Sequence, residues 1–225
     1  MSEAWPDRAG GSHTHPCGYD RLVRATTAGG RAQTQERRGT RQELLLDTVE
    51  RLLADRSFRD LTVAEVMAEA DLPRTTFYRY FPDLEAILLL GVARVSAELG
   101  DAAALWLNDV TDPVASLRPS AAALIEVYVA HSRLFLAFAE AAASAPAVER
   151  AWQDALGGFV DLATARIEEL AAAGRSDLEH PRATATALIW MTERFLLQTY
   201  GHEPQLPVST AVDVLELVWR RTLFP

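Results

Sequence analysis

The fold is decided by residues 61–88, which read LTVAEVMAEADLPRTTFYRYFPDLEAIL. Thr62 stands before an apolar run and is followed three residues later by Glu65, which is the capping-box pattern of a helix start. We expect one short helix after this cap and a second from Pro73 to about Tyr80. Two short helices joined by a tight turn predict a helix-turn-helix that presents its second helix to a major groove of DNA.

The second of these helices lies in a stretch without acidic residues. Residues 73–81 contain two Arg, two Thr and four aromatic residues. Hydroxyl groups donate to phosphate oxygens, and arginine reaches phosphates or the O6/N7 edge of guanine, so this composition indicates duplex DNA binding. Phe77 and Phe81, four residues apart, are expected in the core instead. The candidate DNA-contacting residues are Thr40, Thr62, Arg74, Thr75, Thr76, Tyr78 and Arg79.

The composition bounds the other function classes. The chain has 225 residues, a formal net charge of −9, no Lys and one cysteine. A single cysteine excludes an internal disulfide framework and a zinc site of four thiolates. The longest apolar run, 86–93, is far shorter than the ~20 residues of a membrane span, and there is no signal-peptide core, so we expect a cytoplasmic protein. His13, His15 and Cys17 form an HxHxC cluster, but we interpret it as part of a solvated tail and expect no metal and no cofactor.

The helical pattern extends along the chain after an N-terminal arm. Apolar residues beyond Thr40 recur at helical spacing, and no stretch alternates for long enough to predict a strand. We therefore expect an all-α protein with about nine helices, divided into a disordered arm (1–37), a helix-turn-helix DNA-binding domain (38–91) and a ligand-binding and dimerisation domain (92–225). The expected helices are 39–55, 63–69, 73–80, 83–107, 114–130, 132–144, 147–173, 181–200 and 208–222.

Two sets of residues resemble a known family. The first set, 61–63, 76–82 and 85–88, is similar to the N-terminal domain of TetR-family transcriptional repressors, and its TFYRYF core is a specific signal. The second set, 185–188, 191–194 and 218–219, is similar to the EthR-type branch of that family. The resemblance implies a repressor that leaves a palindromic DNA operator when it binds a hydrophobic small molecule. A constitutive DNA-binding regulator or a helical adaptor without a ligand remains an alternative.

Three positions depart from the family pattern. Asp71 occupies the turn where the family usually has Gly, and Pro73 stands where the recognition helix usually begins with Ser or Thr. Leu84 stands where the family commonly has a phosphate-binding Lys, so we expect one phosphate contact to be missing. Arginines of the N-terminal arm either replace that contact or bind nothing. The candidates are Arg31, Arg37 and Arg38.

The resemblance also implies a pocket for an elongated, apolar ligand in the C-terminal part. Two family positions that are often Asn are Ile189 and Thr192 here, so we expect a more apolar pocket in which Thr192 and Tyr128 are the few polar groups. Core packing is the alternative role for every large side chain in this part. The expected pocket residues are Trp106, Leu124, Tyr128, Trp152, Phe159, Ile189, Trp190, Thr192 and Trp219.

An enzyme is the rival class of function. Glu193 and Arg194 are adjacent ionisable residues on a largely apolar helix, and His131 lies near Glu126. Adjacent helix residues point about 100° apart, which argues against a dyad that converges on one substrate. No hydrolase, metalloprotease or nucleotide-binding motif is present, so we expect no enzymatic activity.

The last two helices are expected to form a homodimer. Their apolar side chains exceed what one small subunit needs to cover, and a two-fold protein places two recognition helices about 34–36 Å or a multiple apart on a palindrome. The helix that starts near Asp83 is expected to carry movement from the pocket to the DNA-binding segment. The apolar residues in question are Val214, Leu215, Val218 and Leu223.

Overall fold

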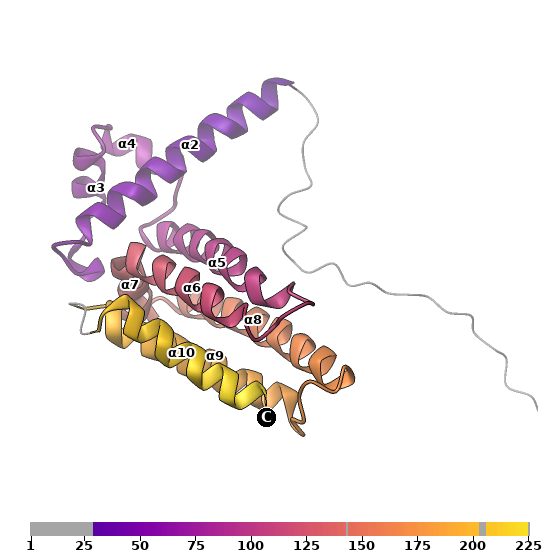
Figure 1. The fold of residues 1–225 in the computed structure, drawn as a ribbon. Coiled ribbons are helices and arrows are strands. Elements are labelled where there is room, and N and C mark those ends of the chain that lie inside the picture. The colour runs from indigo at the N-terminus through magenta and orange to yellow at the C-terminus, as the bar shows by residue number, and fades with distance from the viewer. Residues whose placement is uncertain (1–28, 143, 203–205, 225) are drawn as a thin grey trace, which may run out of the picture. The chain divides into compact units, whose positions relative to one another are not determined.

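The computed structural model describes residues 29–142, 144–202 and 206–224. Within these ranges the chain forms nine α-helices, one 3-10 turn and no strand, so the all-α prediction is confirmed (Figure 1). The elements are α2 (Gly29–Leu52), η1 (Phe58–Asp60), α3 (Val63–Glu69), α4 (Arg74–Phe77), α5 (Glu85–Leu107), α6 (Leu117–Ala130), α7 (Ser132–Ala142), α8 (Pro146–Ala172), α9 (Pro181–Tyr200) and α10 (Val208–Leu223).

The first described helix is longer than predicted. α2 begins at Gly29, whereas the sequence pattern placed the start near residue 39 and left residues 29–37 in a disordered arm. The pattern rested on an apolar period that begins at Leu45, whereas residues 29–38 contain only one apolar residue, Ala32, and so set up no such period. Residues 29–38 contain no proline that would break the helix. The predicted HxHxC cluster lies outside the described residues.

The chain divides into two compact units, one ending at Thr40 and the other comprising residues 41–225. In the second unit, α5 packs along α6 and α8, α8 packs along α9, and α10 packs on α6. Figure 1 shows these five helices side by side, with α7 at one end. Residues of α3, α4 and the α5 N-terminus share one apolar core with residues of α6 and α7. α5 is therefore in contact with both the DNA-binding segment and the C-terminal helices.

Gly91 allows α5 to pass close to two neighbouring helices. A Cβ atom built on Gly91 would lie 3.1 Å from the Leu134 side chain of α7 and 3.4 Å from that of Leu46 in α2. Protein interiors are too densely packed to absorb an added methyl group at such a distance without a shift of the neighbours. A glycine therefore fits the point where α5 runs from the first core into the C-terminal helices.

No single helix in the described part of the chain is long and apolar enough to cross a membrane. α6 and α7 together pass that test, but their axes meet at 73°. The apolar residues of both helices, including Ile125 and Leu134, are buried against the other helices. Burial in the protein core accounts for their composition.

Candidate DNA-binding segment and ligand pocket

The helix-turn-helix begins with the predicted capping box. The Thr62 hydroxyl oxygen accepts from the Glu65 amide at 3.3 Å, and the Glu65 carboxylate accepts from the Thr62 amide at 2.9 Å and from its hydroxyl at 2.7 Å. The bond from the Thr62 hydroxyl, followed by that from Arg56, holds the pKa of Glu65 below its usual value. Thr62 therefore serves first as the cap that fixes the start of α3.

Asp71 forms the turn between α3 and α4 in the left-handed conformation, with φ at 52°. The turn closes because the amides of Asp71 and Leu72 donate to the carbonyls of Ala68 and Met67 at 3.2 and 2.9 Å. Glycine adopts this conformation without steric cost, whereas a residue with a Cβ atom loses on the order of 1 kcal/mol. The structure thus confirms that Asp71 takes the place that glycine favours.

One side of the α4 segment carries exposed polar and aromatic side chains. Arg74, Thr75 and Arg79 are exposed. Tyr78 is also 58% exposed, although it is aromatic. An exposed tyrosine between two arginines can contact phosphate oxygens and base edges, because guanidinium and hydroxyl groups are the usual donors to both. These four residues share one accessible surface.

The other side of the same segment lies in the core. Phe77 and Phe81 are buried, as predicted, with their ring centroids 5.9 Å apart. Thr76 is half-buried between the two sides. Thr40 is exposed on α2, at the end of the N-terminal unit.

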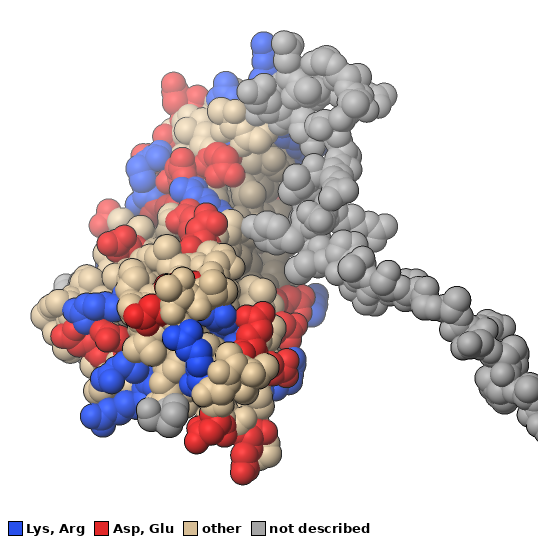
Figure 2. All heavy atoms as spheres, turned by 45° about the vertical axis from the view of Figure 1, so that its right-hand side comes forward, with Lys and Arg blue, Asp and Glu red and all other residues tan. Residues whose placement is uncertain are grey.

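Charged side chains do not gather by sign on the face of the molecule in Figure 2. Arginines and acidic residues are interspersed there. With a net charge of −9, the chain as a whole repels phosphates. The acid-free stretch 73–81 is therefore the part of the DNA-binding segment best suited to approach DNA.

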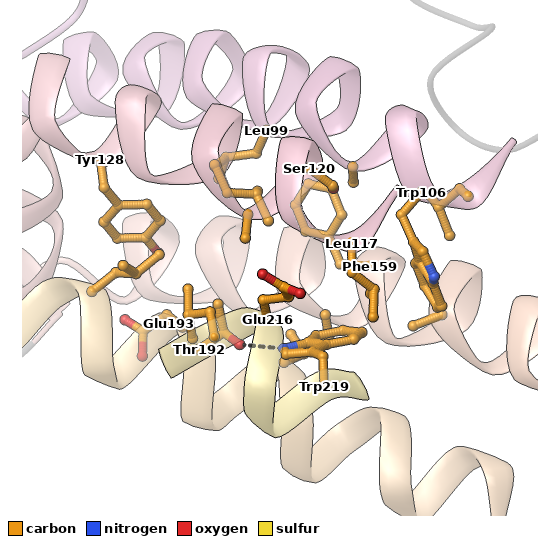
Figure 3. A pocket seen from close by; sticks show the side chains of 18 of the residues that line it. Leu99, Trp106, Leu117, Ser120, Tyr128, Phe159, Thr192, Glu193, Glu216 and Trp219 are labelled. Carbon is orange, nitrogen blue, oxygen red and sulfur yellow. Dashed lines mark hydrogen bonds between the residues drawn. The ribbon is translucent and has the colours of Figure 1, made fainter. Parts of the chain in front are cut away.

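A mainly apolar pocket with about 90 Å³ of interior space lies among α5, α6, α8, α9 and α10. Figure 3 shows Tyr128 and Glu193 at one end and Trp106 at the other. In its wall the Trp219 Nε1 group donates to the Thr192 hydroxyl at 3.0 Å, and the Trp219 ring meets the Trp106 ring edge to face at 5.5 Å. The pocket is elongated and suits a long apolar molecule.

Two family models match the chain, one over the DNA-binding segment and the other over most of the pocket wall. Residues 45–90, which contain the helix-turn-helix, match "Bacterial regulatory proteins, tetR family". Residues 117–225, which contain most of the pocket wall, match "Transcriptional regulator EthR, C-terminal domain". The chain belongs to the TetR family. It is a DNA-binding transcriptional regulator and not an enzyme.

Relatives of this TetR-family chain agree with that assignment. The HTH-type transcriptional regulator EthR of Mycobacterium tuberculosis is 28% identical over 201 residues, which cover 87% of this chain and 92% of the relative. EthR of Mycolicibacterium smegmatis is 25% identical over 204 residues, which cover 88% and 93%. Both alignments therefore include the DNA-binding segment and the pocket.

Solved structures share the fold. A TetR-family transcriptional regulator from Pectobacterium atrosepticum is 24% identical with a TM-score of 0.62, and the match covers 86% of this chain and 97% of that structure. The regulator AibR, solved in complex with isovaleryl coenzyme A and operator DNA, is 15% identical with a TM-score of 0.63, covering 82% and 99%. At these identities the likeness shows the common architecture.

Seven of the nine residues expected at the pocket line it in this TetR-family fold. They come from all five surrounding helices, although the first and the last of them are 113 residues apart in the sequence. The seven are Trp106, Leu124, Tyr128, Phe159, Ile189, Thr192 and Trp219.

Trp152 and Trp190 do not line the pocket, so the expectation was wrong for these two residues. On α8, Trp152 lies one helical turn before Leu156, which lines the pocket, and two turns before Phe159. Its ring packs against the rings of Phe135 and Phe138, with centroids 5.6 and 5.8 Å away. Trp190 is 42% exposed, because it follows Ile189 by about 100° around α9 and points outward.

The pocket also contains polar residues that the sequence reasoning did not assign to it. Glu193 lines it, although it was considered only as half of an enzyme dyad, and Glu216 and Ser120 line it as well. The Ser120 hydroxyl donates to the Ala102 carbonyl at 2.9 Å, and Glu216 accepts from Arg118 at 2.7 Å. The expectation of a pocket with only Thr192 and Tyr128 as polar groups is therefore corrected. The available signal was the position of Glu193 four residues after Ile189, which places both on one face of α9.

Glu193 is 7% exposed. Burial raises its pKa, against the lowering effects of the neighbouring Arg194 and of a hydrogen bond from Trp152. Tyr128 lies near the same carboxylate, and its pKa is raised well above the usual value by burial and by the charge of Glu193. This end of the pocket therefore disfavours negative charge.

A second cluster of ionisable residues joins α2 to α5 and to the start of α7. Arg94 on α5 lies within 3.5 Å of carboxylate oxygens of Glu43, Asp47 and Glu50 on α2, the closest contact being 2.6 Å to Asp47. His131, between α6 and α7, lies 2.6 Å from Glu50 through Nδ1 and 2.9 Å from Glu98 of α5 through Nε2. These bonds, the one with Glu50 first, raise the pKa of His131. We call this cluster the Arg94 junction.

Proposed function

We propose that this regulator is a repressor that leaves a palindromic operator when an elongated, mainly apolar molecule fills the pocket. The observation that carries the proposal is the course of α5. Its N-terminal residues pack in the core that holds Phe77 of the recognition segment, and Leu99 and Trp106 further along it line the pocket. One helix therefore touches both sites.

The proposed DNA-contacting surface is the exposed side of the α4 segment. Arg74, Thr75, Tyr78 and Arg79 contact phosphates and base edges, with Thr76 at the border of the surface. The Thr62 amide and hydroxyl both donate to Glu65, so Thr62 reaches a phosphate only if one of these donors leaves the cap, and Thr40 is a further candidate on α2. The proposed domains are residues 38–91 for DNA binding and 92–225 for ligand binding and dimerisation, with their border in α5 after Gly91.

Dimerisation is proposed through α9 and α10. Trp190, Val214 and Leu217 are each about 40% exposed on these helices, so they offer apolar surface for a second subunit to cover. Leu215 and Leu223, named from the sequence as surplus, are instead buried within the subunit. A homodimer that covers the exposed set would place two α4 segments on one operator, and we place this protein in the cytoplasm, where such DNA lies.

Release follows if the ligand fits only when α5 tilts. The two recognition segments of the dimer would then no longer match the spacing of successive major grooves. Coupling of this kind is typically about 1–3 kcal/mol, or roughly 5- to 150-fold in operator affinity. Reciprocity requires DNA to weaken ligand binding by the same factor.

The DNA-binding surface is tested with Arg74→Ala and Tyr78→Ala. Each variant should weaken operator binding by about 1–3 kcal/mol, because each removes donors to DNA from an exposed side chain; Tyr78→Ala also removes the edge contact of its ring with the buried Phe77 ring. Footprinting and fluorescence anisotropy on DNA upstream of the protein's own gene measure the change, with exposed Arg150→Ala on α8 as the matched control. Equal affinity of all three variants would refute the assignment.

The release mechanism is tested by filling the pocket. Thr192→Trp should abolish the binding of 6-phenylhexan-1-ol, used as an elongated probe, and with it any effect of the probe on operator affinity. Val129→Trp adds the same ring on the exposed side of α6 and should leave both intact. A probe that saturates the wild-type pocket, shown by calorimetry, without changing operator affinity contradicts the mechanism.

A further inference from the structure

One acceptor in the pocket wall has an incomplete set of partners. The Glu193 side chain lines the pocket and is more than nine-tenths buried, and its Oε2 atom is buried without a hydrogen-bond partner in the described structure. A buried carboxylate oxygen without a donor is costly, and native proteins almost always supply one. An exception in the wall of a ligand pocket points to a donor that arrives with the ligand.

The neighbours of Glu193 leave this position open. Arg194 is the nearest cation, but its Nε lies 3.9 Å from Oε2, beyond hydrogen-bond distance, and its side chain is 62% exposed. Trp152 supplies one hydrogen bond to the carboxylate. A carboxylate has about four lone-pair sites, so these contacts do not satisfy it.

Three other polar side chains of the pocket are already paired, whereas the Nε1 group of Trp106, a donor at the opposite end, is also buried without a partner. Ser120 donates to a backbone carbonyl, Thr192 accepts from Trp219, and Glu216 is paired with Arg118, which also bonds to Asp213. Among the described residues that line the pocket there are two carboxylates and no basic side chain. The pocket therefore combines an apolar wall with a carboxylate at its Tyr128 end that has fewer hydrogen bonds than it can accept.

We propose that the effector is an amphiphilic cation, an elongated apolar molecule with a protonated amine at one end, and that Glu193 accepts hydrogen bonds from that amine. The inference deepens the proposed function, on which it rests for the effect on DNA. The apolar body lies along Phe159, Leu117 and Trp219, and the ammonium group lies by Tyr128, whose ring face also attracts a cation. A hydroxyl head group donates one hydrogen bond to Glu193 but does not balance its charge, and a carboxylate head group is repelled.

The experiment compares three probes that differ only in the head group: 6-phenylhexylamine, 6-phenylhexan-1-ol and 6-phenylhexanoate. Isothermal titration calorimetry at pH 7.5 on the full-length protein should give amine affinity at least about tenfold above alcohol affinity, since hydrogen bonds to charged groups are the strong ones. The acid should bind least. The order in the wild-type protein is a test that no variant's folding can disturb.

Glu193→Gln keeps the shape and the acceptor for Trp152 but removes the charge. It should reduce the amine preference to within about threefold and leave alcohol binding close to wild type, whereas Glu126→Gln, which removes an exposed charge on α6, should keep the preference. Thr192→Trp should abolish amine binding, which places the amine in this pocket. Melting curves by circular dichroism establish that each variant is folded.

Several results would overturn the inference: no amine binding, a wild-type protein that binds the alcohol or the acid more tightly, or a preference that survives Glu193→Gln. A different result would separate it from the proposed function. If the amine binds with a Glu193-dependent preference but leaves operator affinity unchanged, the chemical class of the ligand is supported and the release mechanism is contradicted.

Discussion

The Arg94 junction and the Glu193 end of the pocket are two clusters of ionisable residues in one fold, and they differ in how completely their groups are paired. At the junction, Arg94 faces four carboxylates, and both ring nitrogens of His131 have a carboxylate partner. In the pocket, Glu193 retains an oxygen without a donor. The complete pairing at the junction suits a structural contact between α2 and α5, whereas the unpaired oxygen in the pocket suits a ligand that brings a hydrogen-bond donor.

The largest expected effect comes from breaking the paired cluster. Arg94→Met should lower the free energy of unfolding by about 2–3 kcal/mol, because it leaves Glu43, Asp47 and Glu50 close together without a cation. The side chain is 26% exposed, so solvent screening keeps the loss below that of a fully buried pair. Urea unfolding measures the change.

The control for this prediction is Arg182→Met. Arg182 lies 2.7 Å from Asp161, but both side chains are about two-thirds exposed, and such pairs contribute less than about 1 kcal/mol. If Arg94→Met costs no more than Arg182→Met, the junction is not a structural clamp.

A smaller effect of opposite sign is expected from the unpaired cluster. Glu193→Met should raise the free energy of unfolding by about 1 kcal/mol at pH 7.5, because it removes a buried carboxylate with one unpartnered oxygen and fills a similar volume. The same substitution is expected to abolish the preference of the pocket for the amine probe. Loss of stability in this variant would mean that Glu193 is a structural residue.

The same variant has a pH signature. Because burial raises the pKa of Glu193, its favourable contribution is present below the unfolded value of 4.5 and is lost as the pH rises through the raised pKa. The advantage of Glu193→Met should therefore be larger at pH 7.5 than at pH 5.0 in urea unfolding.

The smallest expected effect concerns His131 at the junction. Its pKa is raised, so the stabilisation from its charged form is fully present below the unfolded value of 6.5 and is lost as the pH rises through the folded pKa. The difference in unfolding free energy between wild type and His131→Gln should therefore fall by about 0.5 kcal/mol or more between pH 6 and pH 9. A pH-independent difference would show that the imidazole acts only by packing.

The helix-turn-helix could be predicted because its signals are local. The Thr62 and Glu65 cap, the left-handed Asp71 and the buried Phe77 each depend on residues a few positions apart, and the structure shows all three. The start of α2 could not, because residues 29–38 contain too few apolar residues to set up a helical period.

The pocket was predictable only in part, since five helices build it. Its apolar wall, for instance Leu99, Leu156 and Leu196, has the same spacing as ordinary core residues, so the pattern does not separate a wall from a filled interior. Trp152 was expected in the pocket wall but packs against Phe135, and Glu193 lines the pocket although it was not expected there. Small rotations of α8 and α9 decide which of their side chains reach the pocket. Such rotations follow from packing over the whole fold.

The contact between Trp219 and Thr192 gives the pocket an optical property. The chain has five tryptophans, and two of them, Trp106 and Trp219, have their indole rings against each other in the pocket wall. Indole emission shifts with the polarity around the ring and with the hydrogen bond of its N–H group, and an entering molecule changes both surroundings at once. Trp190, exposed on α9, would keep its emission. The protein thus contains its own fluorescent indicator of occupancy, which can be read without attaching a dye.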